Sequence, residues 1–117
     1  MPVRVLIVDD DPSFRQRGAT VLAERGYQVV GEAETLEQAR AAIARARPNA
    51  LLLDVNLPDG DGIAFARELA SADGGLRLLL TSSDAGAVPP RLLDRSGAAG
   101  FVAKVDLAAA DLAPYLG

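Results

Sequence analysis

The sequence contains no cysteine and no histidine. Without cysteine, neither disulfides nor thiolate metal sites can form. Without histidine, the chain lacks the commonest general base, the commonest zinc ligand and any phosphohistidine donor. No apolar stretch approaches the roughly 18 residues that are needed to span a bilayer. These absences exclude thiol chemistry, the usual zinc chemistry and a membrane-spanning helix.

Composition and charge are those of an ordinary acidic domain. Of 117 residues, 50% are apolar and 24% are charged, and the sequence pI is about 4.7. The arginines are scattered, which argues against a nucleic-acid surface. The length fits one domain, so we expect a single domain over residues 1–117. The start, Met1–Val5, lacks the apolar region of a signal peptide, so we expect a cytoplasmic protein without a membrane partner.

Apolar runs of strand length alternate with segments of helical period. The predicted strands are Val3–Val8, Gln28–Ala33, Ala50–Leu53, Leu76–Leu80 and Gly100–Ala103. The predicted helices run from Pro12 to Gly26, from the cap Thr35 to Pro48, over Ile63–Ala72, from Pro89 to Gly97 and over Leu107–Leu116. Such alternation implies parallel strands with right-handed crossovers. We therefore predict an α/β fold, with an open parallel sheet covered by helices on both faces.

Charged side chains follow three of these strands. Asp9 and Asp10 come after the first strand, Asp54 after the third and Lys104 after the fifth. In parallel sheets, ligands bind beyond the carboxyl ends of the strands. Magnesium suits such a group, because it takes a few carboxylates and keeps positions for water and phosphate. The sequence therefore predicts a site for a divalent cation and a phosphoryl group.

The residue types also suggest individual roles. Asp54 is a candidate nucleophile that would form an acyl phosphate. Lys104 is a point charge on a long stem, suited to pair first with Asp54 and then with a phosphoryl oxygen. Ser82 or Thr81, after the fourth strand, can donate a hydroxyl hydrogen to another phosphoryl oxygen. No side-chain base is required, because the metal and the ammonium neutralise the developing charge.

Three motifs carry a family resemblance. They are Val8-Asp9-Asp10-Asp11-Pro12, Leu53-Asp54-Val55-Asn56-Leu57-Pro58-Asp59-Gly60-Asp61-Gly62 and Gly97-Ala98-Ala99-Gly100-Phe101-Val102-Ala103-Lys104. In this order and spacing they resemble the receiver domain of two-component response regulators, over essentially the whole chain. The resemblance implies a (βα)5 fold of the flavodoxin and CheY type, with strand order 2-1-3-4-5. It also implies a signalling domain that is not an enzyme beyond its own phosphorylation and dephosphorylation.

The resemblance further implies a phosphoacceptor and a metal site. Asp54 would accept the phosphoryl group from a histidine kinase or a phosphotransfer protein. The side chains of Asp10 and Asp54 and the carbonyl of Asn56 would bind Mg2+ (or Mn2+), with Asp9 reaching the ion through water. The output partner is unknown. We expect no nucleic-acid contact by this domain, which would be a monomer or a weak phosphorylation-dependent dimer.

The same resemblance implies a switch. Lys104 would hold the phosphoryl group, and Phe101 would change rotamer when a hydroxyl moves in, although core packing is the other interpretation of Phe101. The usual spacing to the lysine selects Ser82 for that hydroxyl, with Thr81 as the alternative. Asp11 is assigned only to the first turn of its helix, and the aspartates of the Pro58–Gly62 loop only to the turn.

Two departures from the family pattern concern the surface. The lysine is usually followed by proline in a cis bond, but here Val105 follows. A cis bond before a non-proline residue costs about 3 kcal/mol, so we expect a trans bond or local strain. The segment Asp84–Ser96, with two prolines, would shorten or displace the fourth helix, which belongs to the output face in the family.

Two other functions are weighed against this one. A haloacid-dehalogenase-like phosphatase would use Asp9 and Asp11 as its opening motif, with Thr81 and Lys104, but would leave Asp54 without a role. A receiver-like scaffold would bind a partner without phosphorylation. The sequence has no second domain for DNA binding or catalysis. We therefore expect that the chain either acts by itself or is one part of a longer regulator.

Overall fold

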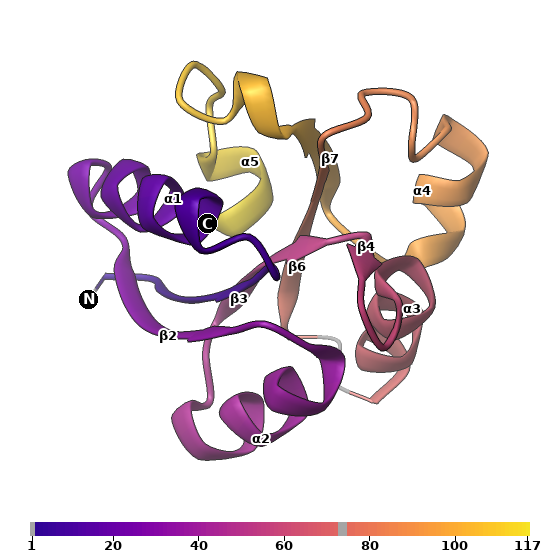
Figure 1. The fold of residues 1–117 in the computed structure, drawn as a ribbon, viewed down its shortest axis with the longest axis horizontal. Coiled ribbons are helices and arrows are strands. Elements are labelled where there is room, and N and C mark those ends of the chain that lie inside the picture. The colour runs from indigo at the N-terminus through magenta and orange to yellow at the C-terminus, as the bar shows by residue number, and fades with distance from the viewer. Residues whose placement is uncertain (1, 73–74) are drawn as a thin grey trace.

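The computed structural model describes residues 2–72 and 75–117 (Figure 1). The strands of the main sheet are β1 (Arg4–Val8), β2 (Gln28–Ala33), β3 (Ala50–Asp54), β6 (Arg77–Ser82) and β7 (Gly100–Ala103). The helices are α1 (Pro12–Glu24), α2 (Leu36–Ala46), α3 (Gly62–Ala72), α4 (Pro90–Ser96), the 3-10 turn η1 (Lys104–Asp106) and α5 (Ala113–Leu116). A small antiparallel hairpin of β4 (Asn56–Leu57) and β5 (Gly60–Asp61) follows β3.

The main sheet is parallel throughout, in the order β2-β1-β3-β6-β7. Counting only the five strands of this sheet, that is the predicted order 2-1-3-4-5, so the predicted α/β fold is confirmed. Helices α1 and α5 lie on one face, and α2, α3 and α4 lie on the other (Figure 1). Because all five strands run the same way, their carboxyl ends share one edge of the sheet.

The core consists of two apolar layers, one on each face of the sheet. Strand β3 is buried along its whole length, and its side chains alternate between the layers. Leu51 and Leu53 pack on the side of α2 and α3, whereas Leu52 packs against Phe14 and Leu22 of α1. Each such buried leucine contributes about 2 kcal/mol of transfer free energy. The layers therefore fix the register that positions the residues at the strand ends.

The predicted cap Thr35 is present, whereas Asp11, assigned only to the first turn of its helix, is the N-cap of α1. Asp11 Oδ1 accepts the backbone N–H of Ser13 at 2.9 Å and caps α1. Thr35 Oγ1 accepts the N–H of Gln38 at 3.1 Å and caps α2. Helix α4 begins at Pro90, and Gly97, in the left-handed region with φ of 77°, follows it. The short fourth helix is thus confirmed.

The final helix predicted over Leu107–Leu116 is wrong. Only α5, four residues long, is α-helical there, and it follows η1 and a series of turns. Pro114 explains the break, because proline has no N–H to donate to the carbonyl of Ala110 and its ring clashes with that carbonyl in a continuous helix. The guanidinium of Arg25 instead donates to the carbonyls of Ala108 and Ala110. The segment therefore keeps turns of its own, with the N–H groups of Ala109 and Ala110 donating to the carbonyl of Asp106, and is also tied to the end of α1.

Candidate functional site

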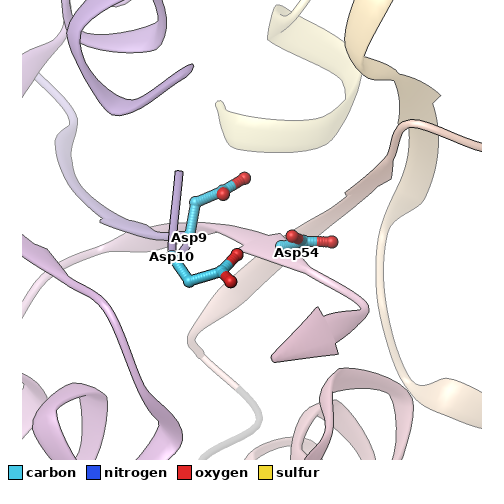
Figure 2. A group of neighbouring side chains, drawn as sticks. All are labelled: Asp9, Asp10 and Asp54. Carbon is cyan, nitrogen blue, oxygen red and sulfur yellow. The ribbon is translucent and has the colours of Figure 1, made fainter. Parts of the chain in front are cut away.

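The carboxyl edge of the sheet brings Asp9, Asp54 and Lys104 together. Asp9 follows β1 and is fully buried, Asp54 ends β3 and is 5% exposed, and the Lys104 side chain, just after β7, is 12% exposed. Asp10 is exposed. Figure 2 shows that Asp9 and Asp10, adjacent in sequence, both extend toward the side where Asp54 lies. The predicted convergence of these strand-end residues is therefore present.

Lys104 forms ion pairs with both buried carboxylates. Its Nζ lies 2.7 Å from Asp9 Oδ2 and 3.4 Å from Asp54 Oδ2. The predicted contact with Asp54 is present, but Asp9 is the nearer partner. The buried Oδ2 of Asp9 has this ion pair and no hydrogen bond. The ammonium therefore lies between two carboxylates that come from different strands.

Burial raises the pKa of Asp54, because a charged carboxylate loses hydration at this position. The N–H of Asn56, which donates to Asp54 Oδ1 at 3.1 Å, opposes that shift. The negative charge of Asp9 raises the pKa further, and the ammonium of Lys104 lowers it. Burial also opposes the charge on Lys104, but the two carboxylates outweigh burial and raise the pKa of its ammonium. The ammonium of Lys104 and the carboxylate of Asp54 therefore stabilise each other's charged forms against the cost of burial, and the carboxylate of Asp9 also stabilises the ammonium.

Gly62 allows α3 to begin directly against the end of β3. Its N–H donates to the carbonyl of Val55 at 2.9 Å. A Cβ on Gly62 would lie 2.4 Å from the carbonyl oxygen of Asp54 and 2.7 Å from Cα of Val55. Those separations are far below van der Waals contact, so any other residue would push the helix or the strand away. The close approach fixes the backbone that carries Asp54.

The carboxylates of Asp9, Asp10 and Asp54 form a group that can hold a metal ion. One oxygen from each lies within 4.8 Å of the other two. Carboxylate oxygens are ligands that Mg2+ prefers, and the sequence has neither the imidazole of histidine nor the thiolate of cysteine. The residues present thus fit a hard divalent cation. The predicted carbonyl ligand, Asn56, follows Asp54 by two positions at the start of the β4–β5 hairpin.

Both candidate hydroxyls lie in β6, which continues two residues beyond the predicted end of the strand. Thr81 is in register with Asp54, and Ser82 is in register with Ala103. Both are buried; Ser82 Oγ accepts the N–H of Asp84 at 3.1 Å, whereas Thr81 Oγ1 has no hydrogen-bond partner. Because side chains alternate along a strand, the two hydroxyls project from opposite faces of the sheet.

Phe101 lies on the face that carries α2, α3 and α4. It is in register with Leu80 and is partly buried against the apolar layer on that face. Ser82, two residues after Leu80, projects from the same face. Phe101 and the hydroxyl of Ser82 are therefore on one side of the sheet, as a coupled pair requires.

The sequence profile of the response regulator receiver domain matches residues 5–113, nearly the whole chain. The chain belongs to this family. It is a receiver domain of the kind found in two-component systems, and the (βα)5 fold agrees with that assignment. Phosphorylation and magnesium binding are general features of receiver domains.

Solved receiver domains share this structure. The signal receiver domain of NarL from Mycobacterium tuberculosis is 31% identical, with a TM-score of 0.77, and the match covers 92% of this chain and 91% of that one. A LuxR-family response regulator from Aurantimonas is 30% identical, with a TM-score of 0.80, over 89% of this chain and 75% of that one.

Curated relatives are longer proteins. The transcriptional activator DevR/DosR of Mycobacterium tuberculosis is 41% identical over 105 residues, which cover 87% of this receiver domain and 48% of the activator. A protein-glutamate methylesterase of Alkalilimnicola ehrlichii is 36% identical, but the match covers only 29% of that protein, so its name gives this chain no enzymatic activity. The chain spans about half the length of the curated relatives it matches, or less.

The departures from the family pattern have simple structural outcomes. The peptide bond between Lys104 and Val105 is trans, within a chain that has no cis bond over its described residues. The side chain of Val105 is 85% exposed.

In residues 2–72 and 75–117, no helix has the length and apolar character to cross a bilayer.

Sequence reasoning missed several residues that shape the site. Asp59, assigned only to its turn, accepts the N–H groups of Leu36 and Glu37 at 2.8 and 3.1 Å and so caps α2 from a distance. That assignment was wrong, because such a contact leaves no local signal in the sequence. Arg15 donates to the carbonyl of Asp9 at 2.7 Å, and Phe14 lies beside Lys104. Asp61, as expected, serves the local backbone by accepting the N–H of Ile63.

Proposed function

We propose that Asp54 of this receiver domain accepts a phosphoryl group from a sensor histidine kinase or a phosphotransfer protein in a Mg2+-dependent reaction. One observation carries the proposal: a nearly buried carboxylate at the carboxyl edge of the sheet lies 3.4 Å from a lysine ammonium and beside two further carboxylates. A receiver domain with this arrangement has a nucleophile, a counter-charge and a cation site within one small region. Family membership supports the same assignment.

The transfer requires little from the chain beyond placement and charge. The P–N bond of the donor phosphohistidine breaks as a bond forms between phosphorus and an Asp54 carboxylate oxygen. The imidazole leaves with the electron pair of the broken bond and takes up a proton from solvent. Lys104 would compensate the negative charge on the phosphoryl oxygens. The N–H of Asn56 holds Asp54 Oδ1 in place at 3.1 Å.

Magnesium would be held by the carboxylates of Asp10 and Asp54 and by the carbonyl of Asn56. When bound, the ion neutralises charge on the phosphoryl oxygens and helps to orient them. Asp9 would act through water, and its contact with Lys104 at 2.7 Å is consistent with such an indirect role. Mn2+ has the same preference for oxygen ligands and would substitute.

The switch would follow from the phosphoryl group itself. The hydroxyl of Ser82 would donate to a phosphoryl oxygen, and Phe101, on the same face of the sheet, would occupy the space that Ser82 leaves. Thr81 is the alternative hydroxyl, and its lack of a hydrogen-bond partner keeps it in consideration. An output protein or domain would bind differently to the face that carries the short helix α4 once Ser82 and Phe101 have moved.

The setting of this chemistry is also a proposal. Residues 1–117 would act as one receiver domain in the cytoplasm, as a monomer or a weak phosphorylation-dependent dimer, without touching nucleic acid itself. Some of the relatives that match are named as transcription regulators, and another is named as a methylesterase. Identifying the partners that this domain binds would test which kind of output it serves.

The test is incubation with Mg2+ and acetyl phosphate, followed by mass spectrometry of the intact chain. We expect the added mass of one phosphoryl group, lost in Asp54→Asn and retained in Asp61→Asn, a nearby exposed aspartate. Retention of the added mass in Asp54→Asn would show that the nucleophile is another residue. No added mass in the wild type would favour the phosphorylation-independent scaffold. Steady hydrolysis of phosphate esters that Asp9→Asn abolishes and Asp54→Asn does not would favour a phosphatase.

A further inference from the structure

The ammonium of Lys104 has a third neighbour besides its two carboxylates. Its Nζ lies 4.6 Å from the centroid of the Phe14 ring. Phe14 stands in the first turns of α1 and is 2% exposed. The ammonium thus lies between two carboxylates from the sheet and an aromatic ring from a helix.

This geometry is that of a cation–π contact in a largely dehydrated place. A ring face attracts a cation most strongly when water is excluded, and a separation within about 6 Å is sufficient. Arg17 also lies near this ring, at 5.8 Å, but its side chain is on the exposed part of α1. Lys104 is therefore the closer and the less hydrated of the two cations.

The space around Lys104 explains why a third contact matters. A cavity of about 180 Å3 adjoins the site and is lined by Phe14, Lys104, Val105 and Leu107, among others. A lysine has a long, flexible stem, so the ammonium can retreat into such a space and leave the carboxylates. The ring of Phe14 makes the position next to Asp9 and Asp54 the favoured one.

We propose that Phe14 is a positioning residue that holds the Lys104 ammonium beside Asp54. The role rests on the proposed phosphoryl transfer to Asp54 and adds a residue outside the three motifs of the site. It requires the aromatic face of Phe14 and not merely its volume. Variants that keep the ring therefore differ from variants that keep only the apolar bulk.

The first experiment detects the contact without any phosphoryl transfer. Protons above an aromatic ring resonate upfield, so in NMR spectra of the wild type we expect the Lys104 Hε signals to be shifted upfield of those of exposed lysines. The shift persists in Phe14→Tyr and disappears in Phe14→Leu and Phe14→Met. Unchanged Hε signals in Phe14→Leu overturn the proposal.

The second experiment measures the rate constant for phosphorylation by acetyl phosphate with saturating Mg2+. We expect Phe14→Tyr to keep the wild-type rate, and Phe14→Leu and Phe14→Met to lose about three- to tenfold, the range of a partly dehydrated cation–π contact. The two apolar variants complement each other, because Leu and Met have similar volumes but Met is longer and more flexible than Leu. An equal loss in Phe14→Tyr, or a faster reaction in Phe14→Leu, overturns the proposal.

Phe65 provides a matched control. It is 2% exposed, belongs to α3, and has the guanidinium of Arg40 at 4.9 Å from its ring. Phe65→Leu thus loses the same core volume and the same kind of contact on the other face of the sheet. We expect a comparable loss of stability with a wild-type rate and wild-type Lys104 signals. An equal loss of rate in Phe65→Leu would mean that core packing, not Phe14, sets the rate.

The two proposals fail in different ways. If the wild type takes up no phosphoryl group while the upfield Lys104 signals are present, the proposed function fails and the positioning contact stands. If the wild type is phosphorylated but all Phe14 variants match it, the positioning role fails and the phosphoacceptor assignment stands.

Discussion

The Lys104 ammonium lies 2.7 Å from Oδ2 of Asp9, a carboxylate with no exposure to solvent. Its distance to Asp54 is longer, at 3.4 Å. Lys104 therefore forms its closer ion pair with Asp9, and the carboxylate of Asp54 is less tightly paired with the ammonium. A nucleophile benefits from that division, because a carboxylate fully engaged by a cation is a weaker donor of electrons.

Replacing Lys104 by methionine should destabilise the protein. The substitution keeps a long apolar stem but leaves the carboxylates of Asp9 and Asp54 without their cation, and removing one partner of a buried pair is costly. We expect a loss of up to about 3 kcal/mol in the free energy of unfolding at pH 7 without divalent cations. Urea denaturation measures it.

Arg40→Met is the control for that experiment. Arg40 pairs with Glu68 at the surface, where both side chains are 52% exposed. Exposed ion pairs contribute about 0–1 kcal/mol, so the loss should be smaller than in Lys104→Met. Equal losses in the two variants would contradict the charge arrangement described for the site.

Replacing Asp54 by asparagine should stabilise the protein at neutral pH in the absence of Mg2+. Burial raises the pKa of Asp54, so the folded state binds this proton more tightly than the unfolded state. Stability contributed by such a group falls as pH rises through its window. The gain in Asp54→Asn should therefore be present at pH 7 and vanish below the unfolded-state pKa of about 4. Urea midpoints across this range test the sign, and a loss of stability at pH 7 would contradict it.

Asp59 should stabilise the fold above its pKa and cease to do so in acid. Its hydrogen bonds to the backbone of α2 lower the pKa of its carboxyl group. A lowered pKa gives stability that is present above the unfolded-state value of about 4 and is lost as pH falls through the folded-state value. Thermal denaturation of Asp59→Ala should show a lower Tm than the wild type at pH 7, with the difference shrinking in acid. Asp94→Ala, in the exposed part of α4, serves as the control and should show a smaller difference.

Gly62→Ala should disturb both stability and the site. The added Cβ would meet the backbone of Asp54 at 2.4 Å, and backbone cannot move aside as a flexible side chain can. We expect a cost of about 1–3 kcal/mol, typical of overpacking, measured by urea denaturation, together with slower phosphorylation. Gly86→Ala is the control, because its Cβ would have Asp84 Oδ1 at 3.5 Å as its nearest neighbour. If Gly62→Ala proves as mild as Gly86→Ala, α3 does not constrain Asp54.

The sheet and the charged group could be predicted because their signals are local. Apolar runs such as Ala50–Leu53 have a single buried solution, and parallel strands must bring their carboxyl ends to one edge. Asp9, Asp54 and Lys104 therefore converge once the strands are recognised. The strand order came from the family resemblance, which the profile match supports.

The remaining features depend on contacts between distant residues. The alanine-rich segment before Pro114 has a strong helical preference, but two of its carbonyls, those of Ala108 and Ala110, accept from Arg25, the residue that follows α1. The contacts of Asp59 with α2 and of Phe14 with Lys104 likewise join separate elements. Neither the spacing nor the type of these residues predicts which distant residue each one contacts, so these contacts are known only from the folded structure.

The place of β7 in the sheet gives the site an asymmetry. Strand β3, which carries Asp54, has a neighbour on each side, whereas β7 is an edge strand paired only with β6. An interior strand yields little, and a short edge strand opens more easily. The carboxylate of Asp54 is therefore held in a fixed position, whereas Lys104, just after the edge strand, can move more easily. When a phosphoryl group enters the site, we expect Lys104 and the end of β7 to move, and β3 to stay in place.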